Sequence, residues 1–289
     1  MHTQDKESKH RTESGLELYV VENRVSNPIG QIVYLHGYTE HSRRHDATIE
    51  RLNGWGYDVV RYDHRGYGRS EGERAYISSF QEYIDDLKEI LNKYKDSRLP
   101  TVLMGVSMGC LLITKYLIDN TDHNIKGAIL VAPALKLDDS VGPLLRKVSG
   151  LLSAIAPKLK TIPLDSSKLS RNPAVEKAYK ADPLVYLKGA KTRTGHEMLK
   201  TMNYVQAHAY KITIPIGIFH GDADGLADIQ GSKTMKERVG SDDCELYTFK
   251  GFYHELFQEE GKEEVYASIH AWLTDAKRMN QFHVPADIA

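Results

Sequence analysis

Three short segments carry residues whose types and order are suited to nucleophilic catalysis. The first is Gly105-Val-Ser-Met-Gly109, which follows an apolar run and precedes an apolar helical pattern. A GxSxG sequence in that position holds its serine on a sharp turn between strand and helix, with the hydroxyl exposed above the sheet. Ser107 is therefore the predicted nucleophile. An ordinary glycine-rich turn is the alternative interpretation.

The other two segments supply the base and the acid that a nucleophilic serine needs. With this type of turn, the chain order is serine, then aspartate or glutamate, then histidine. His220-Gly-Asp-Ala-Asp224 and Gly251-Phe-Tyr-His254 follow two later apolar runs in that order. We predict His254 as the base and Asp224 as the acid that orients it. Two nearby acids are alternatives to Asp224: Asp222 and Asp228.

An oxyanion formed at an attacked carbonyl needs two N–H donors. The backbone N–H of Met108, at the predicted helix start, is one candidate. The backbone N–H of Tyr38 is the second, in the His36-Gly-Tyr-Thr39 segment after another apolar run. His36 itself is interpreted as a structural residue that braces this segment.

Six short apolar runs bounded by glycine predict the strands that position these residues. They are residues 31–35, 57–62, 101–104, 128–131, 214–219 and 245–249. Amphipathic stretches between them predict helices, at about residues 80–94, 111–118 and 263–272. This alternation predicts an α/β protein with a mainly parallel central sheet flanked by helices. In such sheets, ligands bind at the carboxyl ends of the strands, where the candidate residues lie.

Residues 136–210 interrupt the alternation with helical pieces and with helix breakers such as Pro157, Pro163, Pro173 and Pro183. We predict that they form a helical cap, inserted into a core made of residues 1–135 and 211–289. One apolar stripe in the cap has helical spacing and is the buried side of a cap helix, the wall of a tunnel under the cap, or a surface that rests on lipid. Its members are Leu144, Val148, Leu151, Leu152, Ile155 and Leu159.

Charge and composition argue against several kinds of partner. The 38 basic and 39 acidic residues give a net charge of -1, so nothing favours nucleic acid binding. A polar N-terminus and the lack of long apolar stretches predict no secretory signal and no membrane-spanning helix, hence a cytoplasmic protein. Cys110 and Cys244 are interpreted as reduced thiols, although a disulfide between them stays open. No phosphate-binding glycine motif or metal-ligand spacing occurs, so no cofactor or metal is expected.

Four motifs together resemble the monoacylglycerol lipase branch of the α/β-hydrolases, also called the serine-aminopeptidase-like or lysophospholipase-like group. The resemblance extends from about Gly30 to Trp272 and is weakest in the cap. A GxSxG motif is shared by many esterases, whereas HGxxEHS combined with DHRGYGRS is much more specific. The motifs are Tyr34-Leu-His-Gly-Tyr-Thr-Glu-His-Ser42, Asp63-His-Arg-Gly-Tyr-Gly-Arg-Ser70, Gly105-Val-Ser-Met-Gly109 and Gly251-Phe-Tyr-His254.

The resemblance implies an α/β-hydrolase fold and hydrolysis of monoacylglycerols to glycerol and fatty acid through an acyl-enzyme. It also implies that Glu40, Arg44 and the cap residue Tyr179 bind the glycerol head. For Glu40 and Arg44, a salt bridge that shapes the loop is the alternative interpretation. Val106 and Phe257 depart from the mammalian pattern, since each stands in place of a histidine.

The same resemblance implies that the cap covers an apolar tunnel for the acyl chain, with transient peripheral membrane contact through the cap. A lysophospholipase or general carboxylesterase with the same three catalytic residues is the nearest alternative. A non-catalytic binding protein on this scaffold is a further alternative, since a fold does not fix a function. Oligomeric state, acyl-chain length and positional preference on glycerol stay open.

Overall fold

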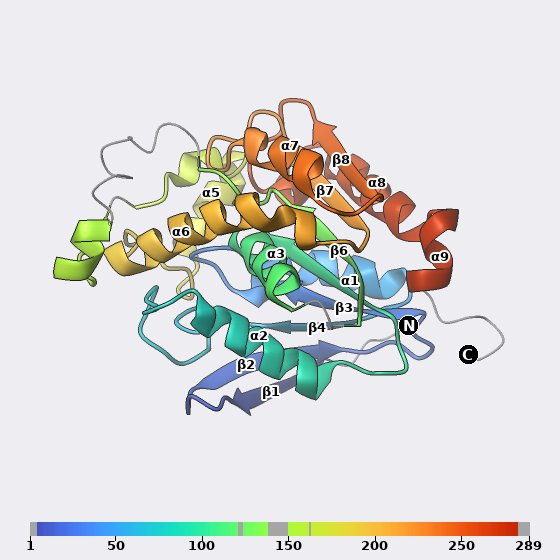
Figure 1. Cartoon of the computed structure of the whole chain (residues 1–289), viewed down its shortest axis with the longest axis horizontal. Helices are drawn as coiled ribbons and strands as arrows, with labels where there is room; N and C mark the ends of the chain where they lie inside the picture. Colours follow the sequence, from blue (N-terminus) through green and yellow to red (C-terminus); the bar gives the residue numbers. More distant parts are fainter. Residues whose placement is uncertain (1–4, 121–123, 138–149, 162, 283–289) are drawn as a thin grey trace.

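An eight-stranded sheet forms the centre of the protein (Figure 1). The computed structural model describes residues 5–120, 124–137, 150–161 and 163–282. The strand order is β1-β2-β4-β3-β5-β6-β7-β8, and the neighbours from β4 to β8 all pair in parallel. The strands are β1 (Asp5–Arg11), β2 (Glu17–Asn23), β3 (Gly30–Leu35), β4 (Tyr57–Tyr62), β5 (Thr101–Val106), β6 (Ile125–Val131), β7 (Ile216–Gly221) and β8 (Cys244–Phe249).

The six predicted strands correspond to β3 through β8, which confirms the mainly parallel sheet. The structure adds an antiparallel pair at one edge, in which β1 pairs with β2 and β2 pairs with β4. Neither strand is among those predicted from the sequence. β1 has the sequence DKESKHR and is mostly exposed, so it lacks the apolar run by which buried strands were recognised.

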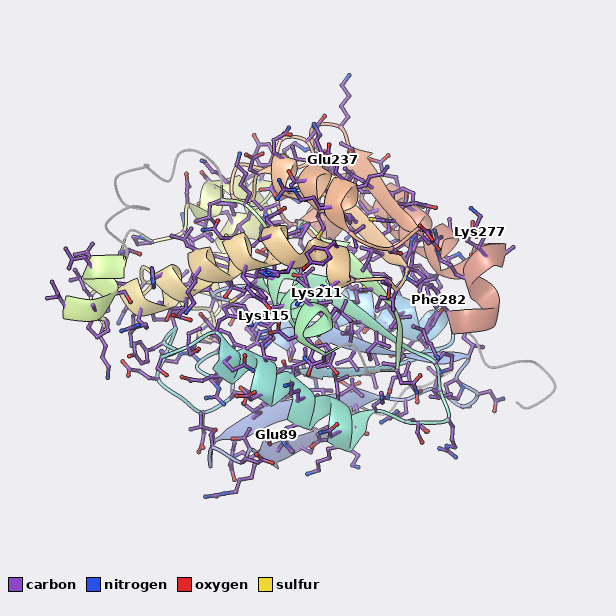
Figure 2. All side chains as sticks on the ribbon, in the orientation of Figure 1. Glu89, Lys115, Lys211, Glu237, Lys277 and Phe282 are labelled. Carbon is purple, nitrogen blue, oxygen red and sulfur yellow. The ribbon has the colours of Figure 1, made fainter. Side chains whose placement is uncertain are left out.

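Helices cover both faces of the sheet, as a parallel sheet requires. α2 (Gln81–Tyr94), α3 (Met108–Asp119) and α7 (Ile229–Arg238) contribute to the apolar core on one face. α1 (Asp46–Gly54), α8 (Lys262–Thr274) and α9 (Ala276–Phe282) contribute to the core on the other. Charged side chains such as Glu237 and Lys277 extend from the outer helix surfaces, whereas Phe282 packs on Trp272 inside (Figure 2).

The described residues between β6 and β7 contribute no strand to the central sheet. They form η2 (Ser166–Lys168), α5 (Pro173–Ala181), α6 (Thr192–His208) and η3 (Ala209–Lys211). α6 packs against α3 and α7, and its Met202 and Val205 belong to the core beneath it. The cap boundaries at residues 136 and 210 therefore stay a prediction. Leu144 and Val148 of the predicted stripe lie outside the described residues.

Both cysteines are free thiols, in agreement with the simpler prediction. Cys110 is fully buried in α3, while Cys244 at the start of β8 is only partly buried. Burial raises the pKa of the Cys244 thiol to about 11, so this thiol stays protonated at neutral pH.

Candidate active site

Ser107 occupies the junction between β5 and α3. Its backbone has φ 51° and ψ -113°, a conformation that costs a non-glycine residue roughly 1–3 kcal/mol. Two glycines make this turn sterically possible. A Cβ on Gly105 would lie 2.8 Å from the carbonyl carbon of Gly109, and one on Gly109 would lie 2.3 Å from the oxygen of Leu35. The structure thus places Ser107 on the strained strand-to-helix turn that its motif predicts.

Asp224 and His254 come from the loops that follow β7 and β8 and meet at the carboxyl edge of the sheet. Nδ1 of His254 lies 2.6 Å from Oδ2 of Asp224, and the aspartate side chain has no exposed surface. The other carboxylate oxygen accepts backbone N–H bonds from Leu226 at 2.8 Å and Ala227 at 3.0 Å. These bonds fix the plane of the carboxylate that faces the histidine.

The two alternative acids have other partners. Asp222 accepts a hydrogen bond from the backbone N–H of Gly251, which ties the two loops together. Asp228 accepts a hydrogen bond of 2.8 Å from the backbone N–H of Gln230 at the start of α7, and it pairs with Lys136. Of the three candidate acids, the structure therefore brings Asp224 to His254.

Electrostatics favour a charged Asp224 beside His254. Burial by itself raises the pKa of Asp224, but the two histidines that contact it outweigh burial and hold that pKa far below its ordinary value. For His254, burial by itself lowers the pKa, yet the charge and hydrogen bond of Asp224 outweigh this and raise it. The ion pair is thus stabilised whenever His254 gains a proton.

This raised pKa predicts the pH dependence of activity. A histidine acts as a base only when neutral, so activity must be lost as the pH falls through the pKa of His254. Because Asp224 raises that pKa, we expect the acid limb of kcat/KM to have its midpoint above 6.5, the ordinary histidine value. The measurement is kcat/KM for a p-nitrophenyl ester between pH 5 and 9. A midpoint below 6.5 would contradict the expectation.

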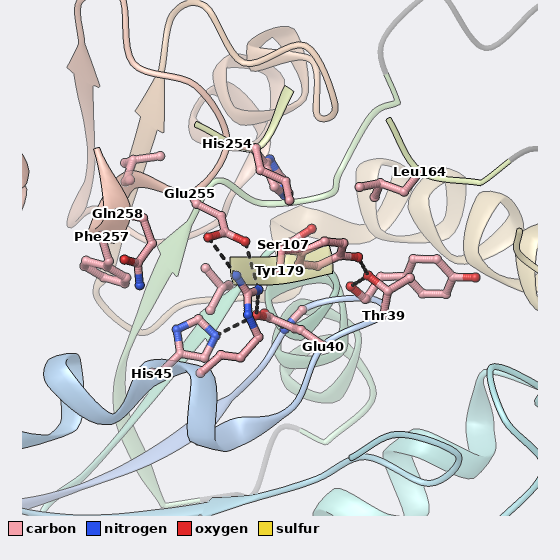
Figure 3. A pocket seen from close by; sticks show the side chains of 16 residues that line it. Thr39, Glu40, His45, Ser107, Leu164, Tyr179, His254, Glu255, Phe257 and Gln258 are labelled. Atoms are coloured by element: carbon pink, nitrogen blue, oxygen red, sulfur yellow. Dashed lines mark hydrogen bonds and ion pairs between the residues drawn. The ribbon is translucent and has the colours of Figure 1, made fainter. Parts of the chain in front are cut away.

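Ser107 and His254 line one pocket together with residues of the loop after β3 and of the segment between β6 and β7 (Figure 3). In the described part of the chain, no hydrogen bond joins the Ser107 hydroxyl to His254. Such contacts are often long before substrate binds and tighten in the complex. The other lining residues include Gly37, Tyr38, Thr39, Glu40, Arg44, Val106, Leu164, Leu169, Tyr179, Glu255 and Phe257.

Both predicted oxyanion donors belong to segments that border Ser107. The loop after β3 approaches Ser107 so closely that a Cβ on Gly37 would lie 3.3 Å from the serine Cβ. Tyr38 follows directly, and Met108 is the first residue of α3, where backbone N–H groups lack helical partners. His36 braces the loop as predicted: it is fully buried, its Nδ1 lies 2.8 Å from the oxygen of Gly37, and its Nε2 accepts from the backbone of His64.

Glu40, Arg44 and Tyr179 also come together in the pocket (Figure 3). One Glu40 oxygen accepts from the backbone N–H of Gly37 at 2.6 Å, and the other accepts from Arg44 at 2.9 Å. The Arg44 guanidinium lies 4.8 Å above the centre of the Tyr179 ring, and the Tyr179 hydroxyl bonds to Thr39. The internal salt bridge that sequence analysis left as an alternative is therefore present.

Glu255 is a pocket residue that sequence analysis missed. It forms two hydrogen bonds with Arg44, at 2.9 and 3.1 Å, and is separated from it by 211 positions in the chain. The only signal in the sequence was the position of Glu255 directly after His254.

The charge of Glu40 is stabilised by its neighbours. Burial by itself raises the pKa of Glu40, but His45 and Arg44 outweigh burial and lower it well below its ordinary value.

A parallel sheet covered by helices, with a strained serine turn and an aspartate–histidine pair at its carboxyl edge, defines an α/β-hydrolase. A family model described as "Serine aminopeptidase, S33" matches residues 26–261, and the chain belongs to this family of hydrolases.

Individual relatives agree with this assignment. The chain is 31% identical to a "Monoacylglycerol lipase" of Mycolicibacterium smegmatis over 250 residues, which cover 86% of this chain and 89% of the relative. It is 32% identical to the "Phospholipase YtpA" of Bacillus subtilis, over 86% of this chain and 96% of that protein. The crystal structure of a Paleococcus ferrophilus monoacylglycerol lipase superposes with a TM-score of 0.82 at 31% identity, covering 89% and 98% of the two chains. The fold and family that the motifs predicted are confirmed.

Proposed function

We propose that the protein is a serine ester hydrolase that cleaves monoacylglycerols to glycerol and fatty acid. The observation that carries this proposal is the buried Asp224–His254 pair, which opens on the same pocket as Ser107 on its strained turn. Three residues from three separate loops converge there in the arrangement that acyl transfer requires. No other described residue is needed as a nucleophile.

In the proposed reaction, Ser107 attacks the ester carbonyl while His254 accepts the serine proton. The tetrahedral oxyanion accepts hydrogen bonds from the backbone N–H groups of Tyr38 and Met108. His254 then donates its proton to the leaving alcohol, which departs as glycerol. Water, activated by the same histidine, releases the fatty acid, and Asp224 stabilises the imidazolium in both halves of the cycle.

The charges around the pocket support a neutral head group. Two carboxylates, Glu40 and Glu255, contact the single guanidinium of Arg44, and the imidazole of His45 lies 3.0 Å from Glu40. The carboxylates thus outnumber the one permanent cation among these residues. A polyol can donate hydroxyl hydrogens to carboxylate oxygens, whereas a phosphate would be repelled by them. Tyr179 and Thr39 supply further hydroxyl groups at the same wall. Glycerol recognition by Glu40, Arg44 and Tyr179 is therefore part of the proposal.

We assign the acyl chain to the apolar side of the pocket and to the cap, proposed as residues 136–210. Leu164 and Leu169 line the pocket from the cap, and Val106 and Phe257 line it from the core. Burying each methylene contributes roughly 0.8 kcal/mol, so a long chain adds more affinity than the head group. The side chains of Val106 and Phe257 carry no polar atom, so they extend the apolar part of the pocket wall.

Phospholipid or general carboxylic ester hydrolysis is the second candidate function. It is favoured by the relative named as a phospholipase, which is 32% identical and aligns over 96% of its own length. The same three catalytic residues would serve, and only the head-group contacts would differ.

Fatty-acid release from monooleoylglycerol, lysophosphatidylcholine and p-nitrophenyl butyrate tests the proposal. We expect kcat/KM to be highest for monooleoylglycerol. The isosteric change Glu255→Gln removes one negative charge and should raise relative activity on the phospholipid. Preference for lysophosphatidylcholine in the wild-type protein would favour the second candidate, and no release from any ester would refute both.

Peripheral membrane contact is a further part of the proposal. The structure contains, in its described segments, no helix that is long and apolar enough to cross a membrane. It does expose three members of the predicted stripe: Leu151, Ile155 and Leu159 are 64%, 74% and 54% exposed. Their exposure argues against the buried side of a cap helix, and none of the three lines the pocket of Ser107, which argues against the tunnel. Lipid is therefore the favoured interpretation.

The triple change Leu151→Ser, Ile155→Ser and Leu159→Ser is predicted to weaken vesicle binding. We expect the affinity for phosphatidylcholine vesicles containing monooleoylglycerol, measured by cosedimentation, to fall roughly 100-fold, because partial insertion of each of the three side chains contributes about 1 kcal/mol. Activity on soluble p-nitrophenyl butyrate should stay the same. Tyr210→Ser, at another exposed apolar residue of 60% exposure, is the matched control. Unchanged cosedimentation of the triple variant would refute membrane contact through this stripe.

A further inference from the structure

A second histidine contacts the carboxylate that the mechanism places beside His254. His220 is the fifth residue of β7 and is fully buried. Its Nε2 lies 3.2 Å from Oδ2 of Asp224, the same oxygen that bonds to His254. The proposed reaction assigns no role to this buried histidine, and its position directly before Gly221 predicted none.

The hydrogen-bond partners of His220 determine which of its ring nitrogens is protonated. Nε2 also lies 3.2 Å from the backbone oxygen of Ala227, and a carbonyl oxygen only accepts hydrogen bonds. Nε2 therefore carries a proton, which is shared between Ala227 and Asp224. On the other side of the ring, Nδ1 lies 2.7 Å from the hydroxyl of the buried Ser232 in α7. A hydroxyl can donate or accept, so it holds the ring in place without changing this assignment.

Asp224 thus receives four hydrogen bonds. Two backbone N–H groups bind Oδ1, while His220 and His254 share Oδ2. The hydrogen bond from His220 is one of the influences that lower the pKa of Asp224 against the effect of burial. Without it, Oδ2 would keep the hydrogen bond to His254 alone, and its position would no longer be restrained from two sides.

We propose that His220 is a positioning residue of the active site, which fixes Oδ2 of Asp224 for its hydrogen bond with His254. Ser232 in turn fixes the ring of His220. The inference rests on the proposed role of Asp224 as the acid of the mechanism. A misplacement of about 1 Å in such a site lowers the rate by as much as about 100-fold, so this contact matters for catalysis as well as for the fold.

Two isosteric changes separate positioning from simple stabilisation of the loop. The amide nitrogen of glutamine stands as far along the side chain as Nε2, so His220→Gln keeps a donor for Asp224. The amide nitrogen of asparagine corresponds to Nδ1 instead, so His220→Asn keeps a partner for Ser232 and loses the donor. Both variants remove the ring, and thermal unfolding measures how far the shorter asparagine costs more packing at this buried site than glutamine does. A purely structural role would lower kcat only in proportion to that loss of stability.

The test is steady-state hydrolysis of p-nitrophenyl butyrate, together with thermal unfolding of both variants. We expect His220→Asn to lower kcat roughly 10- to 100-fold with KM almost unchanged. His220→Gln should recover most of that activity, to within about threefold of the wild-type kcat. Equal kcat values for the two variants, or a loss confined to KM, would overturn the proposal.

A second variant keeps the proposal testable if His220→Asn does not fold. Ser232→Ala retains the imidazole and removes its support, so we expect a smaller fall in kcat, of about threefold, with KM unchanged. An unchanged kcat would count against the inference. If Asp224→Asn is inactive while the two His220 variants match each other, the His220 proposal fails and the proposed function stands. An inactive wild-type protein would instead refute the proposed function.

Discussion

Ser107→Ala is expected to abolish ester hydrolysis, with kcat lowered by about 10⁴-fold or more. The variant lacks the oxygen that forms the acyl-enzyme, and only substrate binding and the oxyanion donors remain to accelerate attack by water. The fold should persist, because Ser107 makes no side-chain hydrogen bond within the described part of the chain. The measurement is fatty-acid release from monooleoylglycerol by purified wild-type and variant protein.

Covalent labelling provides an independent measure of the same residue. A fluorophosphonate should modify wild-type protein at Ser107 and leave Ser107→Ala unmodified. Ser268→Ala is a suitable control, because the Ser268 hydroxyl bonds to a backbone oxygen of its own helix, α8. It should retain full labelling and activity. Wild-type activity in Ser107→Ala would remove Ser107 from the mechanism.

Asp224→Asn is the second change with a very large expected effect, a fall in kcat of about 10⁴-fold at neutral pH. An asparagine fits the space of the aspartate, but its uncharged amide no longer stabilises the imidazolium. It also presents an N–H to His254 in one of its two orientations, which favours the wrong tautomer. KM should change little, since Asp224 is fully buried and absent from the pocket wall.

Asp222→Asn is the matched control for this prediction. Asp222 lies two positions away and bonds to the backbone of Gly251. Asparagine keeps an oxygen that can accept this bond, so we expect kcat within about threefold of the wild type. Equal losses in both variants would show that the loop, and no particular carboxylate, is needed. A fully active Asp224→Asn protein would refute the assignment of the acid.

The strands that carry these residues were recognisable because they are buried on both faces. β4, for example, is buried at all six positions, and its sequence YDVVRY stands out between polar segments. β1 was missed for the opposite reason, since it lies at the sheet edge and consists of charged and polar residues, most of which are exposed to solvent. Local apolar patterning therefore predicts the centre of the sheet much better than its edge.

The candidate nucleophile, base and acid were also predictable, because each follows a strand end within a short and specific motif. Parallel strands direct these loops to the same edge of the sheet, so their order along the chain was enough to place them together. The choice among Asp222, Asp224 and Asp228 was harder. It depends on which side chain the loop turns inward, and the three acids differ in the structure by their backbone partners.

By itself, the sequence determined the parallel part of the sheet, the serine turn and the order of the catalytic loops, since burial and chain geometry act locally. Only the tertiary structure showed that Glu255 pairs with Arg44. It also showed that Leu151 of the stripe is exposed to solvent. A third finding is that the ring of His220 contacts the carboxylate of Asp224, four positions further along the chain. Pairings of this kind depend on how loops from separate strands converge, and on the burial that makes each hydrogen bond obligatory. No periodicity or spacing encodes that convergence, so it is visible only after the chain has folded.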